Sequence, residues 1–173
     1  MSSINQLLLE AKSVTKYFGT ITALENVNLK IHAGECLGVV GDNGAGKSTL
    51  MKVLSGLYKP SAGSLFFDGK EKILESPKDS QNLGLEMVYQ DLALAGNLPI
   101  GENIFLGREP TKNLGLLKFL DYKKIKELTD AHLGKLKINV KSADQKLEEL
   151  SGGQRQAVAI ARSTAFNAKV VIM

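Results

Sequence analysis

The chain has little cysteine, no tryptophan and no long hydrophobic run. Its single cysteine, Cys36, excludes an intrachain disulfide, and the apolar run around it (ECLGVV) predicts a small core side chain rather than a reactive thiol. No apolar stretch approaches the length needed to cross a bilayer, and no charged segment followed by a long apolar one marks a secretion signal. We therefore expect a cytoplasmic protein that reaches a membrane only through a partner.

The chain also lacks a dense basic stripe. Its 22 basic and 18 acidic residues leave a net charge of +4, and the lysines are scattered apart from Lys123, Lys124 and Lys126. This pattern favours an ordinary solvated surface over a nucleic-acid footprint. A length of 173 residues with 43% hydrophobic residues is enough for one domain with a real core.

What the chain does contain is a complete phosphate-binding loop. Residues 41–49 read GDNGAGKST, which matches G-x-x-x-x-G-K-[ST], between an apolar run at 35–40 and a helix-compatible run at 47–57. The glycines let successive N–H groups face one anion, and the helix adds its positive N-terminal end. Lys47 can reach the β- and γ-phosphates, and Ser48 can ligate Mg²⁺. The loop residues expected to bind nucleotide are Gly41, Asn43, Gly44, Ala45, Gly46, Lys47, Ser48 and Thr49.

The rest of the chain alternates strand-like and helical runs. Strands are expected at 7–14, 27–31, 35–40, 64–67 (paired with 72–74 across Asp68-Gly69), 85–89 and 168–173. Helices are expected at 47–57, at 77–82 after Ser76, after the cap Asp121 with Ile125, Leu128, Leu133 and Leu136 on one face, and at 151–165 after Ser151. From about residue 92 we expect helical pieces and loops. This alternation predicts an α/β core around a mostly parallel sheet.

A second glycine motif follows the helical region. Residues 150–154 read LSGGQ, which places a serine hydroxyl and two glycines at a helix N-terminus, where N–H groups lack intrahelical partners. Alone, such a turn is usually only a helix cap. After the phosphate loop and in this order, it resembles the signature of ATP-binding-cassette (ABC) ATPases, and the resemblance covers about residues 7–173.

The resemblance implies a fold with three parts. These are a P-loop NTPase core with an antiparallel β subdomain at 1–95, a helical insertion at 96–149, and the signature helix with the next core strand at 150–173. The 60 positions from Gln90 to Leu150 suit a compact helical subdomain and not the long coiled-coil insertions of chromosome and DNA-repair relatives.

The resemblance also implies roles for single residues. Tyr17 would stack on adenine, and Gln90 would touch Mg²⁺ or the attacking water and sense a membrane partner. The signature residues would bind the γ-phosphate held by the loop of a second subunit, so that two chains close head-to-tail around two ATP. These signature residues are Ser151, Gly152, Gly153 and Gln154.

Residues 88–110 resemble the ATP-binding subunits of bacterial monosaccharide importers. The intact LSGGQ signature resembles that of importer ATPases with one cassette per chain, rather than two. This implies a peripheral protein on the cytoplasmic face of the membrane, with integral permease subunits as direct partners and a sugar-binding protein as an indirect one.

The catalytic carboxylates of ABC ATPases are not among the residues of this sequence. The resemblance implies that the strand at 168–173 ends in an aspartate for Mg²⁺ followed by a catalytic glutamate, and neither is present. His32 and His132 do not match the family's switch histidine. We expect ATP binding by this chain and hydrolysis by a full-length form. Two alternatives stay open: a nucleotide-binding module without turnover, and a soluble ABC protein acting on nucleic acid or ribosomes, which the short insertion and weak charge disfavour.

Overall fold

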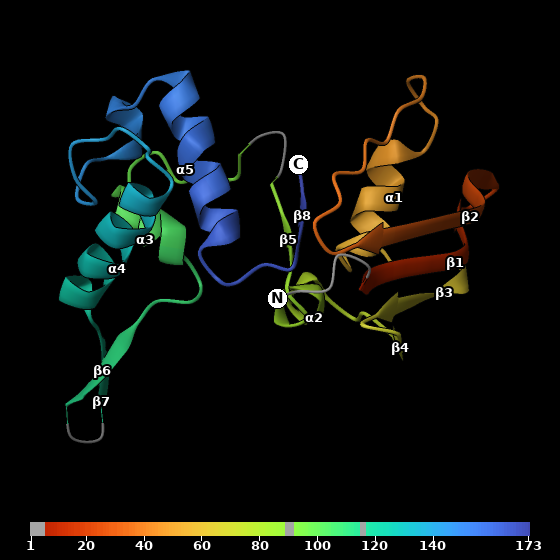
Figure 1. Cartoon of the computed structure of the whole chain (residues 1–173), viewed down its shortest axis with the longest axis horizontal. Coiled ribbons are helices and arrows are strands. Elements are labelled where there is room, and N and C mark those ends of the chain that lie inside the picture. The colour runs from red at the N-terminus through yellow and green to blue at the C-terminus, as the bar shows by residue number, and fades with distance from the viewer. Residues whose placement is uncertain (1–5, 89–91, 115–116) are drawn as a thin grey trace. The chain divides into compact units, whose positions relative to one another are not determined.

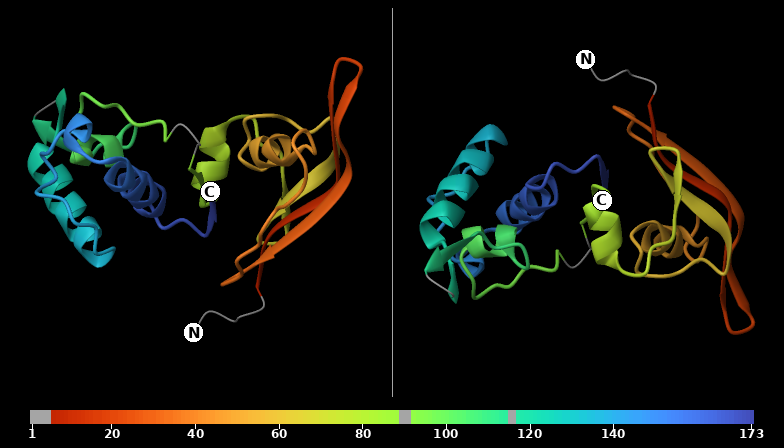
Figure 2. Two further views of the ribbon diagram at one scale, coloured as in Figure 1. Left: turned by 90° about the horizontal axis from the view of Figure 1, so that it is seen from above. Right: turned by 90° about the horizontal axis from the view of Figure 1, so that it is seen from below.

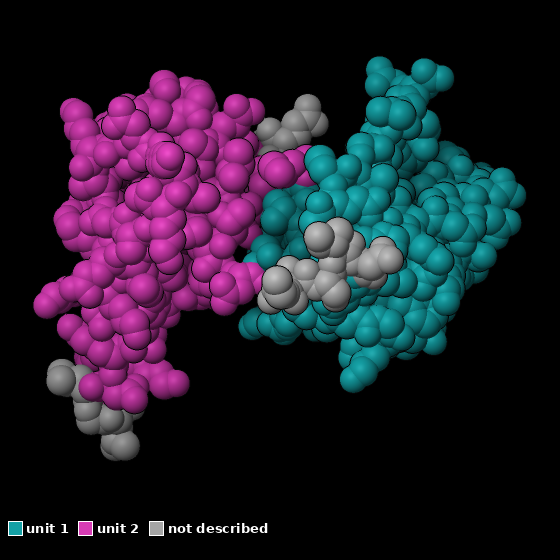
Figure 3. Space-filling view, in the orientation of Figure 1, with its two compact units in different colours: residues 1–86, 168–172 teal, residues 87–167, 173 magenta. Residues whose placement is uncertain are grey.

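The computed structural model describes residues 6–88, 92–114 and 117–173. The chain forms two compact units, one of Met1–Glu86 with Ala168–Ile172 and one of Met87–Asn167 with Met173, which Figure 3 shows in two colours. The phosphate loop belongs to the first unit and the LSGGQ motif to the second.

The first unit is built on an antiparallel sheet in the order β2-β1-β3-β4 (Figure 1). The strands are β1 (Leu7–Phe18), β2 (Ile21–His32), β3 (Ala62–Phe67) and β4 (Lys70–Lys72). Alternate β1 residues Leu9 and Ala11 are buried, and helix α1 (Lys47–Leu54) covers one face of the sheet with Leu50, Val53 and Leu54 (Figure 2). The strands expected at 7–14 and 27–31 are confirmed within longer ones, because apolar side chains alternate along them.

The expected hairpin across Asp68-Gly69 is also confirmed. Both turn residues have positive φ, 48° and 74°, which matches the twist of antiparallel strands. The pairing runs from Phe67↔Lys70 to Leu65↔Lys72, so β4 reaches only the first residue of the expected 72–74.

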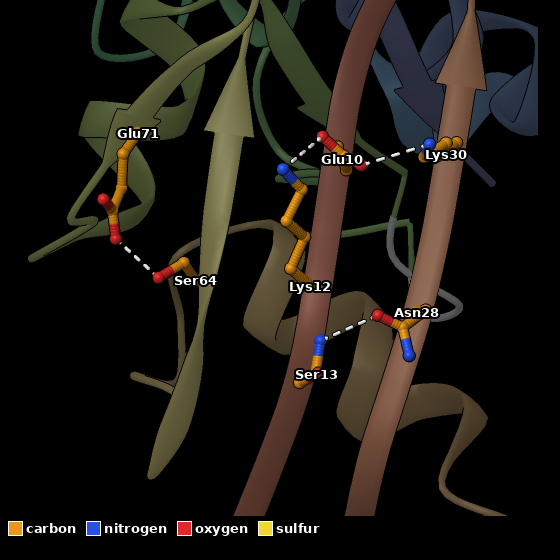
Figure 4. Close-up of polar contacts among 7 residues, drawn as sticks. All are labelled: Glu10, Lys12, Ser13, Asn28, Lys30, Ser64 and Glu71. Carbon is orange, nitrogen blue, oxygen red and sulfur yellow. Dashed lines mark hydrogen bonds and ion pairs between the residues drawn. The ribbon is translucent and has the colours of Figure 1, made fainter.

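The opposite face of the sheet carries charged and polar side chains (Figure 4). The Glu10 side chain is only 10% exposed, and its carboxylate lies 3.4 Å from both Lys12 Nζ and Lys30 Nζ. A carboxylate this buried needs such cationic partners, because burial alone penalises its charge. Ser64 on β3 donates to Glu71 on β4, so the outer face is joined by polar contacts across the strands.

A short helix and a strand pair complete this unit. Helix α2 (Pro77–Asn82) begins after Ser76, as the sequence predicted, and Ser76 forms a capping box with Asp79. The hydrogen bond from the Ser76 side chain, helped by the Glu75 N–H, holds the pKa of the Asp79 carboxyl below its usual value. Strand β5 (Leu85–Met87) neighbours β8 (Val170–Ile172). Both are shorter than the expected 85–89 and 168–173, and Tyr89 lies outside the described residues.

The prediction of a strand at 35–40 is wrong. These residues form no strand and all six are exposed, including Val40 at 91%. Cys36 is therefore exposed and not a core side chain. An apolar run becomes a buried parallel strand only where neighbours accept its backbone hydrogen bonds, and no described strand pairs with it. Helix α1 likewise ends at Leu54 rather than 57, and Leu57 is 44% exposed.

The second unit packs three helices around a core of its own. They are α3 (Ile100–Phe105), α4 (Tyr122–Lys135) and α5 (Gly152–Thr164), with a 3₁₀ turn, η1 (Leu147–Glu149), before α5. Asp121 caps α4 by accepting the Lys124 N–H, as predicted, and Ser151 caps α5. The core residues are Ile100, Ile104, Phe105, Ile125, Leu133, Leu147, Leu150, Val158 and Ala161.

Two expectations for this unit need correction. Leu128 and Leu136 are 42% and 39% exposed, so only Ile125 and Leu133 of the expected α4 face are buried. The region after residue 92 also holds an unexpected hairpin, β6 (Thr111–Leu114) and β7 (Leu117–Leu120), labelled below the helices in Figure 1. Its short strands gave too few residues for a period-2 pattern to stand out. Among the described residues, no helix has the length and apolar character to span a bilayer.

Candidate nucleotide-binding site

The phosphate loop turns into helix α1 at Gly46. Gly44 and Gly46 have φ of 88° and 82°, which an L-residue rarely adopts. The Ala45 N–H donates to the Asp42 carbonyl at 3.1 Å and closes the bend. Because the first N–H groups of a helix have no intrahelical acceptor, those of Lys47, Ser48 and Thr49 are available to an anion at this end of α1.

Lys47 is held inside the loop. Its Nζ donates to the carbonyl oxygens of Gly41 and Asp42, both at 2.7 Å. These two bonds hold the ammonium group against the backbone of the loop. A bound phosphate would therefore meet the positive charge at the same place as the helix N-terminus.

The end of the loop presses against strand β2. A Cβ at Gly46 would lie 2.5 Å from the Ala23 carbonyl oxygen and 2.9 Å from a Leu24 methyl carbon. Since the nearest atom belongs to backbone, the space cannot be opened by a side-chain rotation. Sequence reasoning explained this glycine by loop conformation alone and missed Ala23, because the contact joins residues 23 positions apart.

Tyr17 lies near the same part of the sheet. It pairs with Thr22 across β1 and β2, one residue before Ala23, and its side chain is 49% exposed. The Ser61 hydroxyl accepts the Tyr17 N–H at 3.1 Å, which fixes this end of the strand. A half-exposed aromatic ring here can stack on a flat ligand ring, so adenine stacking by Tyr17 stays a prediction.

We expect Tyr17→Ala to weaken ATP binding by about 0.5–1.5 kcal/mol, the range typical of aromatic pairs. Tyr17→Phe should keep affinity within about twofold of the wild type, since the ring remains. Titration calorimetry with ATP measures both. Tyr122→Ala, which removes an exposed ring from the second unit, is the control. A phenylalanine variant no better than alanine would show that stacking is the wrong role.

Ser48 and Gln90 are the predicted metal ligands. Ser48 is the second residue of α1 and is exposed, so its hydroxyl can serve as one hard oxygen ligand. Gln90 lies outside the described residues. Within the part of the chain that the structure describes, no group of three or more His, Cys, Asp or Glu could hold a metal. Mg²⁺ binding by Ser48 and Gln90 stays a prediction.

The LSGGQ motif forms a capping box. The Ser151 hydroxyl accepts the Gln154 N–H at 3.3 Å, and Gln154 Oε1 accepts the Ser151 N–H at 3.0 Å. Gln154 Nε2 also donates to the Asn139 carbonyl. Gly152 and Gly153 are exposed, and a Cβ at either would meet nothing within 4 Å. The motif thus presents a bare backbone surface at the start of α5.

Neither histidine joins these motifs. His32 is the last residue of β2, and its Nδ1 lies 3.1 Å from Glu35 Oε2. The hydrogen bond from the His32 backbone N–H is the main cause that lowers the pKa of the Glu35 carboxyl. His132 Nε2 contacts the Ala161 carbonyl oxygen and Thr164 Oγ1, which joins α4 to α5. Both contacts are structural.

The match to a family model covers most of the chain. Residues 24–173 match the model described as ABC transporter. The chain belongs to the ABC transporter family. The xylose/arabinose import ATP-binding protein XylG of Sulfolobus acidocaldarius is 49% identical over 166 residues, 96% of this chain and 64% of that relative. The chain thus spans less than two thirds of the length of this relative.

Solved structures of ABC cassettes have the same fold. A nucleotide-free ATP-binding cassette from an ABC transporter superposes with a TM-score of 0.80 at 27% identity, over 95% of this chain and 67% of that one. A dimeric cassette in a post-hydrolysis state, bound to ADP and Pi, gives a TM-score of 0.73 at 28% identity, over 95% and 72%. The ABC ATPase fold expected from the motifs is confirmed, and cassettes of this family bind nucleotide.

Proposed function

We propose that this chain is the nucleotide-binding part of an ATPase subunit that powers ABC-type import of a simple sugar. The single observation that carries the proposal is the geometry of the loop, in which Lys47 Nζ bonds to the Gly41 and Asp42 carbonyls and the chain turns at Gly46 into the N-terminus of α1. The name of the XylG relative, an import ATP-binding protein for xylose and arabinose, supports a sugar as cargo.

In this proposal the triphosphate of ATP lies across residues 41–49, with its oxygens on the N–H groups of Gly44 to Thr49. Lys47 exchanges one of its carbonyl partners for the β- and γ-phosphates, and Tyr17 stacks on adenine. Ser48 and Gln90 would hold Mg²⁺, which neutralises phosphate charge when bound. Gln90 would also orient the attacking water. Asn43 and Ala45 complete the loop around the phosphates.

A second subunit would supply the other half of the site. Its Ser151, Gly152, Gly153 and Gln154 would face the γ-phosphate, so that ATP joins two chains and hydrolysis releases them. The dimeric relative bound to ADP and Pi supports this arrangement. We further propose that the full-length protein is peripheral on the cytoplasmic face of the membrane, with permease subunits as partners and a sugar-binding protein outside.

Removing the Lys47 charge tests the proposal. Lys47→Ala is expected to weaken ATP binding by about 1.5–3 kcal/mol, the usual worth of a hydrogen bond to a charged group. Lys52→Ala, on the last turn of the same helix, should bind like the wild type. Calorimetry with ATP and Mg²⁺ gives both affinities, and an unchanged Lys47→Ala affinity would contradict the loop assignment.

Measuring phosphate release from ATP distinguishes an ATPase from a nucleotide-binding module without turnover. Release by this chain above a no-protein control would favour an ATPase, and binding without release would favour a module that lacks turnover. Salt-sensitive binding to duplex DNA or RNA would instead favour the nucleic-acid alternative.

A further inference from the structure

The segment that follows Gln90 has an uncommon backbone. Leu92 and Ala93 are consecutive non-glycine residues with φ of 59° and 45°. An L-residue in the left-handed region brings its Cβ close to the next carbonyl oxygen, so two in succession are strained. Such a conformation persists only where surrounding contacts hold it. The contacts of this segment therefore show what fixes it.

The first of these contacts comes from helix α5. Arg162, in the last turns of this helix, donates from its guanidinium to the Ala93 carbonyl oxygen at 2.9 Å. A charged donor makes a stronger bond than a neutral one. The left-handed segment is thereby attached to the C-terminal part of the helix that begins at Ser151.

A second attachment joins the same segment to the N-terminal side of α5. The Glu148 N–H donates to the Gly96 carbonyl at 3.0 Å, and the Leu147 N–H donates to the Leu98 carbonyl at 3.3 Å. Glu148 lies three residues before Ser151. Asn103, which is fully buried, accepts the Ala95 N–H at 2.8 Å and donates to the Ala95 carbonyl at 3.0 Å. Residues 93–98 are thus bonded to Arg162 near the end of α5 and to η1, the turn that precedes this helix.

We propose that Arg162 is a positioning residue that makes residues 92–98 and helix α5 move as one body. A displacement of the segment after Gln90 then carries Ser151 with it. The inference rests on the proposed function, in which Gln90 and Ser151 serve nucleotide sites. Without the Arg162 bond, Leu92 and Ala93 relax from the left-handed region, and the segment stays connected to α5 only through the packing of Leu94 on the shared core and the backbone pairing of residues 96–98 with η1.

Amide hydrogen exchange on this chain, read by mass spectrometry or NMR, tests the coupling. The reporters are the N–H groups of Ala95, Glu148 and Gln154, which lie on the segment, at its pairing with η1 and at the α5 cap. We expect Arg162→Met to speed exchange at all three by about tenfold, the effect of losing one charge-assisted bond. Arg162→Lys keeps a cationic donor and should restore most of the protection. Arg155→Met, at an exposed position on the same helix, should match the wild type.

Three outcomes would overturn the proposal. Faster exchange at Ala95 alone would show that Arg162 acts only locally. Equal acceleration throughout α4 would show that it merely stabilises the whole unit. Unchanged exchange at all reporters would show that the bond from Arg162 to the Ala93 carbonyl does not stabilise the segment or the helix. If Arg162→Met does not fold, Arg162→Gln, which keeps a neutral donor, replaces it and should give a smaller acceleration in the same three reporters.

ATP affinity measured on the same samples keeps this test separate from the proposed function. The phosphate loop belongs to the other unit, so all Arg162 variants should bind ATP within about twofold of the wild type. A wild-type chain that binds no ATP would contradict the proposed function and leave the exchange result for Arg162 standing.

Discussion

Gly46→Ala is expected to lower ATP affinity by more than about tenfold, through strain alone. The new Cβ would lie 2.5 Å from the Ala23 carbonyl oxygen, which belongs to the backbone of β2. It would also force alanine to a φ of +82°, which costs roughly 1–2 kcal/mol before any clash is relieved. Relief requires the start of α1 to move away from β2, and this movement displaces the N–H groups that we propose bind the phosphates.

Gly34→Ala separates the cost of the positive φ from the cost of the clash with Ala23. Gly34 has a similar φ of +77°, but a Cβ there meets no atom within 4 Å, so this variant carries the conformational cost without the clash. We expect it to lower the free energy of unfolding by about 1–2 kcal/mol and leave ATP affinity unchanged. Calorimetry and urea unfolding on both variants give the comparison. Equal ATP affinity in the two variants would show that the Ala23 contact does not shape the loop.

Asn103→Ala is expected to lower the free energy of unfolding by about 2–4 kcal/mol, the range for leaving buried polar groups unpaired. Asn103 is fully buried in α3 and makes four hydrogen bonds to the loop before it, at 2.8–3.2 Å. The carbonyls of Ala95, Leu98 and Pro99 each keep another donor. The Ala95 N–H is left without its acceptor, and this orphaned donor supplies much of the cost.

Urea unfolding followed by circular dichroism measures this effect. Asn97→Ala is the matched control, because Asn97 lies in the same loop and is exposed. It should change the free energy of unfolding by less than about 0.5 kcal/mol, as most exposed substitutions do. A loss below about 1 kcal/mol for Asn103→Ala would indicate that water replaces the missing side chain.

The features that the sequence predicted well depend on neighbouring residues. Ser76, Asp121 and Ser151 each begin a helix as expected, because the hydrogen bonds between side chain and backbone that start these helices join residues only three positions apart. The turn at Asp68-Gly69 also follows from local chemistry, since two adjacent residues supply both positive φ values.

The features that the sequence did not predict depend on residues far away along the chain. The apolar run at 35–40 is exposed because no described strand pairs with it, and a local pattern cannot supply such a neighbour. Nothing in the composition of the chain singled out Asn103 or Arg162, since each acts on carbonyl groups of a loop that only the fold brings near.

By itself, the sequence determined the family and the chemistry of its two glycine motifs. A phosphate loop and an LSGGQ cap are defined by the order of residues along a few turns of chain, and the ABC family match follows from them. Only the tertiary structure decided that Gly46 rests on Ala23 and that Arg162 holds the strained turn at Ala93. The physical reason is that a backbone carbonyl carries no sequence signal, so its partner is known only once the chain has folded.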